Sequence, residues 1–77
     1  MDFEQQVDDM INEARRICHD INQPLTVIMA RTELLLLKTP EDDKNRRAIE
    51  QIHDQSGKLA ELVDRLRSHL KAFQSSG

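Results

Sequence analysis

Apolar side chains recur every three or four residues along the first half of the chain. Alternating steps of three and four form the heptad pattern of a helix that packs along one side. The pattern predicts a first helix over about residues 3–38. The members of this seam are Phe3, Val7, Met10, Ala14, Ile17, Ile21, Leu25, Ile28, Thr32 (a tolerated polar member) and Leu35.

The regular spacing is interrupted once, where an additional step of four separates Ile21 from Leu25. Such an insertion, called a stutter, locally unwinds a coiled coil. Pro24 lies inside the stutter and lacks the backbone N–H that a helix needs, so we expect a bend there. His19 lies within five residues of Pro24, next to this irregularity.

A second helix is predicted over about residues 40–73, with Thr39 as its cap and Pro40 at its first position. The connection is then short, and the two helices are antiparallel neighbours. Gly57 costs about 1 kcal/mol relative to alanine in mid-helix, which either close helix approach or a hinge would explain. The seam of this helix consists of Ile49, Ile52, Ser56, Leu59, Val63, Leu66, Leu70 and Phe73.

These elements define an all-α fold, with one helical hairpin over residues 1–74 and a flexible tail at 75–77. Two helices cannot enclose seams this wide by contacting only each other. Two copies that form a four-helix bundle would bury both seams, with the commonest symmetry of oligomers. We therefore expect an antiparallel two-helix hairpin that forms a homodimeric four-helix bundle.

Composition narrows the possible environments and partners. The formal net charge is −3 and the basic residues are dispersed among acids, which argues against nucleic acid as a partner. The single cysteine, Cys18, excludes an internal disulfide and fits a reducing compartment. No apolar run approaches the roughly 18 residues of a membrane span, and the N-terminus lacks a signal sequence. We expect a cytoplasmic domain without direct membrane insertion, and membrane anchoring of a longer parent protein stays open.

His19 is predicted to point away from the main seam. On a helical wheel with Leu25 at 0°, the core arc runs from about 280° to 40° and His19 falls near 120°. A second apolar stripe, formed by Val27, Ala30, Leu34 and Leu37, lies outside the main seam on the same side as His19. This stripe marks either a docking surface for a partner or a neighbouring helix of the bundle.

The run His19-Asp20-Ile21-Asn22-Gln23-Pro24-Leu25 resembles the phosphoacceptor motif of two-component sensor histidine kinases. That motif is His, then Glu or Asp, three variable residues and Pro-Leu, and this chain resembles the subgroup with Asn-Gln before the proline. The resemblance covers roughly residues 7–72 and implies the dimerisation and histidine-phosphotransfer domain. It implies that His19 accepts phosphate and that Asp20 acts as general base or orients the imidazole.

The resemblance also implies partners. In complete kinases a separate domain binds ATP and Mg²⁺ and phosphorylates the histidine, and an aspartate of a response regulator receiver domain then takes the phosphate. Gln23, one turn beyond His19, occupies the position that helps orient water for a phosphatase reaction, which is a second possible activity. Arg16 could steady phosphate charge or be an ordinary surface side chain. The predicted partner-binding residues are Arg16, Thr26, Val27, Ala30 and Leu34.

Nothing in the sequence could bind ATP, since the glycine-rich boxes of that nucleotide domain and a Walker loop are both absent. The chain is therefore expected to be a fragment with no cofactor of its own, and whether it is itself an enzyme stays open. No metal site is expected, because Arg15, Arg16, Asn22 and Gln23 are poor ligands around His19. Two alternatives are a purely structural coiled-coil dimerisation module and a stand-alone phosphotransfer protein. The second usually has lysine and glycine after its histidine.

Overall fold

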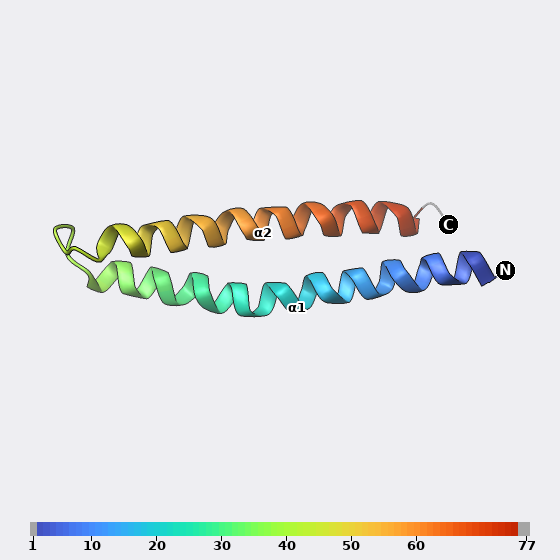
Figure 1. Cartoon of the computed structure of the whole chain (residues 1–77), viewed down its shortest axis with the longest axis horizontal. Helices are drawn as coiled ribbons and strands as arrows, with labels where there is room; N and C mark the ends of the chain where they lie inside the picture. The colour runs from blue at the N-terminus through green and yellow to red at the C-terminus, as the bar shows by residue number, and fades with distance from the viewer. Residues whose placement is uncertain (1, 76–77) are drawn as a thin grey trace.

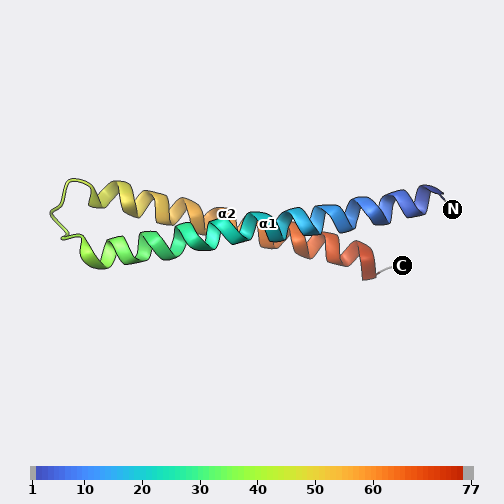
Figure 2. The ribbon, with the colours of Figure 1, turned by 90° about the horizontal axis from the view of Figure 1, so that it is seen from below.

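The computed structural model describes residues 2–75, which form two long helices, α1 (Asp2–Lys38) and α2 (Arg46–Ser75). The helices run antiparallel and side by side, and Figure 1 shows the loop at one end of the hairpin and the free helix ends at the other. Turned by 90°, in Figure 2, α1 crosses α2 near the middle, so the helices are inclined to each other. The molecule is a rod of 62 × 16 × 14 Å. The predicted all-α hairpin is confirmed.

The first helix agrees with its predicted range and continues through Pro24. Pro24 is exposed, so its ring lies on the solvent side of the helix. Figure 1 shows α1 bowed in its teal middle section, the part of the helix that carries this proline. A proline on the outer side removes one hydrogen bond from the helix ladder, and such a loss accounts for a bend in an otherwise regular helix.

The predicted start of the second helix at Pro40 is wrong, because α2 begins at Arg46. The Thr39 hydroxyl donates to the carbonyl of Leu35 at 2.6 Å, so it completes the end of α1 instead of capping α2. The backbone then turns, with Asp43 N–H donating to Pro40 O at 3.0 Å. The Asp43 carboxylate also accepts from the N–H of Asn45 at 2.8 Å, a local bond that competes with helix formation.

Arg46 joins the two helices at the loop end. Its guanidinium donates to the carbonyls of Leu36 at 3.1 Å and of Thr39 at 2.5 Å. The last carbonyls of a helix have no partner within it, so this side chain satisfies acceptors at the C-terminus of α1. The helix that follows the loop thus caps the helix that precedes it.

The helices meet along residues that are seven apart. On α1 the buried members are Cys18, Leu25 and Thr32, and on α2 they are Ser56 and Val63. Half-buried residues extend this line at both ends, including Ile11 and Thr39 on α1 and Ile49 and Leu70 on α2. The strict heptad explains why the contact follows the inclined helices over most of their length.

The single hairpin buries only part of the predicted seam of α1, as expected for a seam that two helices cannot enclose. Ala14, Leu25 and Thr32 face α2, but the alternate members of the seam lie on a neighbouring face and are exposed in the single hairpin. On α2 the seam divides in the same way, with Ile52, Leu59, Leu66 and Phe73 exposed. The exposed members on α1 are Phe3, Val7, Met10, Ile17, Ile21, Ile28 and Leu35. Together these exposed side chains form what we call the outer apolar face.

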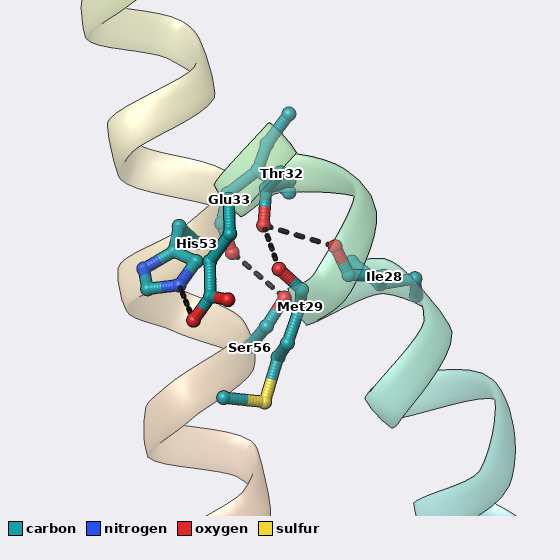
Figure 3. A network of polar contacts seen from close by, with 7 residues as sticks. Ile28, Met29, Thr32, Glu33, His53 and Ser56 are labelled. Carbon is teal, nitrogen blue, oxygen red and sulfur yellow. Dashed lines mark hydrogen bonds and ion pairs between the residues drawn. The ribbon is translucent and has the colours of Figure 1, made fainter. Parts of the chain in front are cut away.

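Two hydroxyl groups are buried in the contact between the helices (Figure 3). Thr32 donates to the carbonyls of Ile28 and Met29 at 2.9 and 3.0 Å, and Ser56 donates to the carbonyl of Ile52 at 2.7 Å. Both hydroxyls are thus satisfied within their own helices, as buried polar groups must be. Beside them, His53 and Glu33 approach to 3.4 Å across the two helices.

The structure describes only part of the tail that was predicted at residues 75–77. Ser75 is the last residue of α2, so it is not part of a tail, and residues 76–77 lie outside the described residues. Within residues 2–75, neither helix is both long enough and apolar enough to cross a bilayer.

Gly57→Ala is expected to stabilise the fold. A Cβ atom on Gly57 would meet no heavy atom within 4 Å outside its own helix turn, so close approach of α1 does not require glycine here. Alanine in mid-helix should raise the free energy of unfolding by about 1 kcal/mol. Urea denaturation at fixed protein concentration measures the change. A destabilised variant would show that this position is occupied by a partner or needs to bend.

Candidate functional site

His19 lies on the outer surface of α1, as predicted. Its side chain is exposed, whereas the preceding residue, Cys18, is only 1% exposed and packs against α2. Neighbouring residues on a helix point about 100° apart, so burial of Cys18 turns the imidazole sideways, toward solvent. The packing of α1 against α2 therefore also fixes the direction in which the histidine points.

Gln23 is the nearest polar partner of the imidazole. Its Nε2 lies 3.2 Å from Nε2 of His19, one helical turn away. The amide N–H can donate to this ring nitrogen only when the ring proton is on Nδ1. In that tautomer the lone pair is on Nε2, the atom that would act as a nucleophile. The predicted proximity of Gln23 to His19 is therefore present.

Asp20 follows His19 on the exposed side of α1. Within residues 2–75 its carboxylate makes no hydrogen bond or ion pair, and its contact with the imidazole is not formed in this structure. Adjacent positions on a helix do not face each other, which explains the separation.

A polar hollow of about 440 Å³ opens beside the imidazole, and sequence reasoning did not find it as a site. It is lined by Asn12, Arg15, Arg16, His19 and Arg67. The spacing of three and four residues on α1 placed the first four on one side of the helix, which was a usable signal. Arg67 comes from α2, and its position here depends on the register between the helices.

The second apolar stripe is present on the surface of α1. Val27 is 56%, Leu34 52% and Leu37 83% exposed, and Ala30 is exposed as well. Thr26 lies beside them, although its hydroxyl donates to the carbonyl of Asn22 at 2.8 Å. Within the hairpin α2 does not cover this stripe, so a helix of the same chain is not its neighbour. The stripe is exposed in the single hairpin.

The other two histidines lie in different settings. His53 faces Glu33 across the helices, and Nδ1 of His69 lies 2.9 Å from the carbonyl of Arg65. Among the described residues, no group of three His, Cys, Asp or Glu side chains is close enough together to hold a metal ion.

The arrangement suits a group transfer at one nitrogen. An exposed imidazole is accessible to a bulky donor and a bulky acceptor, and it is a nucleophile when neutral. Arginines on one side supply charge for an anionic group, and an amide on the other side can donate to or accept from a water molecule.

Comparison with known proteins gives one match. The family model of the His Kinase A (phospho-acceptor) domain matches residues 9–69. No curated protein and no solved structure matches the chain. The matched segment holds His19, the seam between the helices and most of the outer apolar face. Since the match covers more than half of its length, the chain belongs to the His Kinase A phospho-acceptor domain family.

Proposed function

We propose that His19 is the phosphoacceptor of a sensor histidine kinase and passes its phosphate to an aspartate of a response regulator receiver domain. The phosphate donor is ATP, held with Mg²⁺ by a catalytic domain outside these 77 residues, which makes the parent protein a phosphotransferase. The observation that carries the proposal is the exposed imidazole of His19 in a chain of the phospho-acceptor family. The reaction belongs in the cytoplasm, where ATP and receiver domains are available.

The transfer consists of two displacements at phosphorus. In the first, the lone pair of His19 Nε2 forms the N–P bond while the bond from phosphorus to the bridging oxygen breaks, and ADP leaves with that electron pair. In the second, a carboxylate oxygen of the regulator attacks phosphorus and the N–P bond breaks, which returns the electron pair to Nε2. Catalysis of such transfers rests mainly on positioning and on stabilisation of charge.

Asp20 is proposed to orient the imidazole in the first step. With the proton on Nδ1, the ring gains positive charge when Nε2 forms its bond to phosphorus. A carboxylate that accepts the Nδ1–H bond stabilises this charge and holds the tautomer. The exposed position of Asp20 leaves its side chain free to rotate toward Nδ1.

Gln23 is proposed to act in a phosphatase reaction, which removes phosphate from the regulator. Its amide lies against Nε2 in the unphosphorylated protein and must move when a phosphoryl group occupies that nitrogen. An amide one turn from the histidine can hold a water molecule in line with the phosphorus of a docked phosphoaspartate.

The domain is also proposed to form a homodimer through its outer apolar face. The accessible surface is 6464 Å², about a third more than expected for a compact monomer of this mass. The lining of an apolar groove includes Ile28, Ile52 and Leu59 of this face and the buried Leu25 beside them. A second copy would cover both helices and complete a four-helix bundle, whereas the His19 side stays outside.

A receiver domain is proposed to dock on the second apolar stripe. Val27, Ala30 and Leu34 follow His19 toward the loop, and Thr26 and Arg16 add polar contacts next to them. A protein seated there would bring its aspartate close to Nε2. The purely structural alternative, a coiled-coil dimerisation module, explains the outer apolar face but gives no reason for this exposed stripe or for the imidazole.

Phosphorylation at His19 can be tested with a histidine kinase catalytic domain and labelled ATP. We expect acid-labile, alkali-stable label that is lost in His19→Gln and kept in His53→Gln and His69→Gln. Asp20→Asn should slow labelling by roughly 10²-fold, since a general base or orienting group contributes about 10²–10⁴-fold. Absence of label on the wild type, while a control phospho-acceptor domain reacts, would support the structural alternative.

The dimer is tested by sedimentation at micromolar concentration. Wild type should sediment as a dimer, and Leu59→Glu should be monomeric because burial of two carboxylates on the outer apolar face is costly. Leu37→Glu, on the other side of α1, is the matched control and should stay dimeric. A monomeric wild type would contradict the proposed assembly.

Docking is tested by transfer from phosphorylated domain to a receiver. Ala30→Arg should slow transfer by roughly tenfold or more, since a charge buried in an apolar contact costs at least about 1.4 kcal/mol, while labelling and dimerisation are kept. An unchanged transfer rate in Ala30→Arg would remove the docking assignment.

The phosphatase role of Gln23 is tested by the loss of phosphate from the receiver. Gln23→Ala should keep forward transfer and slow this loss.

A further inference from the structure

The polar hollow beside His19 is rich in arginine. Three of its five lining residues are arginines, the other two are Asn12 and His19, and none of the described lining residues is Asp or Glu. The chain as a whole has a net charge of −3, so this concentration of guanidinium groups is not a consequence of overall composition. Guanidinium groups bind phosphate by paired N–H donors.

The two helices bring these groups together from both sides. Arg15 and Arg16 lie one turn before His19 on α1, and Arg67 reaches the hollow from α2. Arg67 lies four residues, about one helical turn, beyond the buried Val63, so the two residues lie on the same side of α2. The contact that buries Val63 and Cys18 therefore also sets the distance from Arg67 to the imidazole.

The ion pairs that two of the arginines already make are weak. Arg16 lies 3.1 Å from Glu13 with 70% of its side chain exposed, and Arg67 lies 3.9 Å from Asp64 with 50% exposed. Exposed pairs at this spacing contribute little and are easily replaced. Both carboxylates lie outside the hollow, so an incoming phosphate dianion can take over the guanidinium groups without meeting a negative lining.

We propose that Arg67, with Arg15 and Arg16, forms a phosphate-binding site that holds the phosphoryl group while it is transferred to and from His19. This inference rests on the proposed phosphoacceptor role of His19 and adds a positioning group from the second helix. The ligand is a phosphate dianion, either the group carried on Nε2 or a free phosphate. Binding of the three peripheral oxygens neutralises charge while the N–P bond forms and the bond to the leaving oxygen breaks.

The arrangement divides the surroundings of Nε2 between two functions. Gln23 approaches the nitrogen from the loop side and the arginines lie on the side of the free helix ends. A phosphoryl group held in the hollow would stay clear of Gln23, the residue proposed to act on the docked phosphoaspartate. Contacts from the guanidinium groups to the peripheral oxygens stabilise the phosphoryl group on His19, so the site would lengthen the lifetime of phosphohistidine as well as speed its formation.

Inorganic phosphate is the probe for the site itself. Added to the ¹⁵N-labelled 77-residue chain at mildly alkaline pH, it should cause saturable shifts of the Arg67 Nε–H and the His19 ring resonances. Arg67→Gln should weaken phosphate binding by about threefold to tenfold, the range expected for loss of one charged contact in a solvated site. Arg65→Gln, which makes the same charge change two residues away on α2, is the control and should bind like wild type.

Phosphoramidate, a small donor that needs no ATP-binding domain, tests the role in transfer. Arg67→Gln should be labelled more slowly and should lose phosphohistidine faster than Arg65→Gln, with unchanged helix content by circular dichroism. If only ATP-dependent labelling falls, Arg67 serves the nucleotide or its domain and the proposal is overturned. Equal phosphate affinity in wild type and Arg67→Gln overturns it as well. Failure of every variant to label His19 would refute the proposed function, and the phosphate titration would still decide the site.

Discussion

The contact between α1 and α2 along residues seven apart determines everything else in the molecule. It is narrow, because among the described residues only Cys18, Leu25 and Val63 are buried apolar side chains. So small a core gives little free energy to set against the conformational entropy of a long rod. The outer apolar face holds further apolar surface, which the proposed dimer would bury. The same contact orients His19 and sets the register that brings Arg67 to it.

Three faces of the hairpin carry three different tasks. One face of each helix packs against the other helix, the adjacent face presents the apolar side chains that we propose a second copy covers, and the remaining side of α1 presents the imidazole and the second apolar stripe. Residues seven apart on a helix point in nearly the same direction, so each face forms a continuous line. Adjacent residues point about 100° apart, which leaves room for three such faces around one helix. The stutter around Pro24 follows His19 directly along α1.

The helices, the all-α class and the outward direction of His19 could be predicted from the sequence, since each depends on periodicity within one helix. The division of the seam between two faces was missed, because a pattern of threes and fours does not say which members face the same chain. The start of α2 was misplaced since Thr39 and Pro40 resemble a helix start, while Asp43 and Asn45 form the competing turn. Arg67 needed the register between the helices, which no local pattern contains.

The hydroxyls of Thr32 and Ser56 have a mechanical consequence. Both bond to carbonyls of their own helices, so neither hydroxyl links the helices, and beside the apolar packing the polar contact across them at this level is the 3.4 Å approach of His53 to Glu33. Displacement of one rod along the other at this level would rupture neither bond. At the loop end, in contrast, Arg46 fastens the helices by two hydrogen bonds. The two helices are thus held together firmly at the loop end. His19 and Arg67 lie far from that end on opposite helices, so a small change in the angle between the helices changes the distance from the imidazole to the guanidinium group.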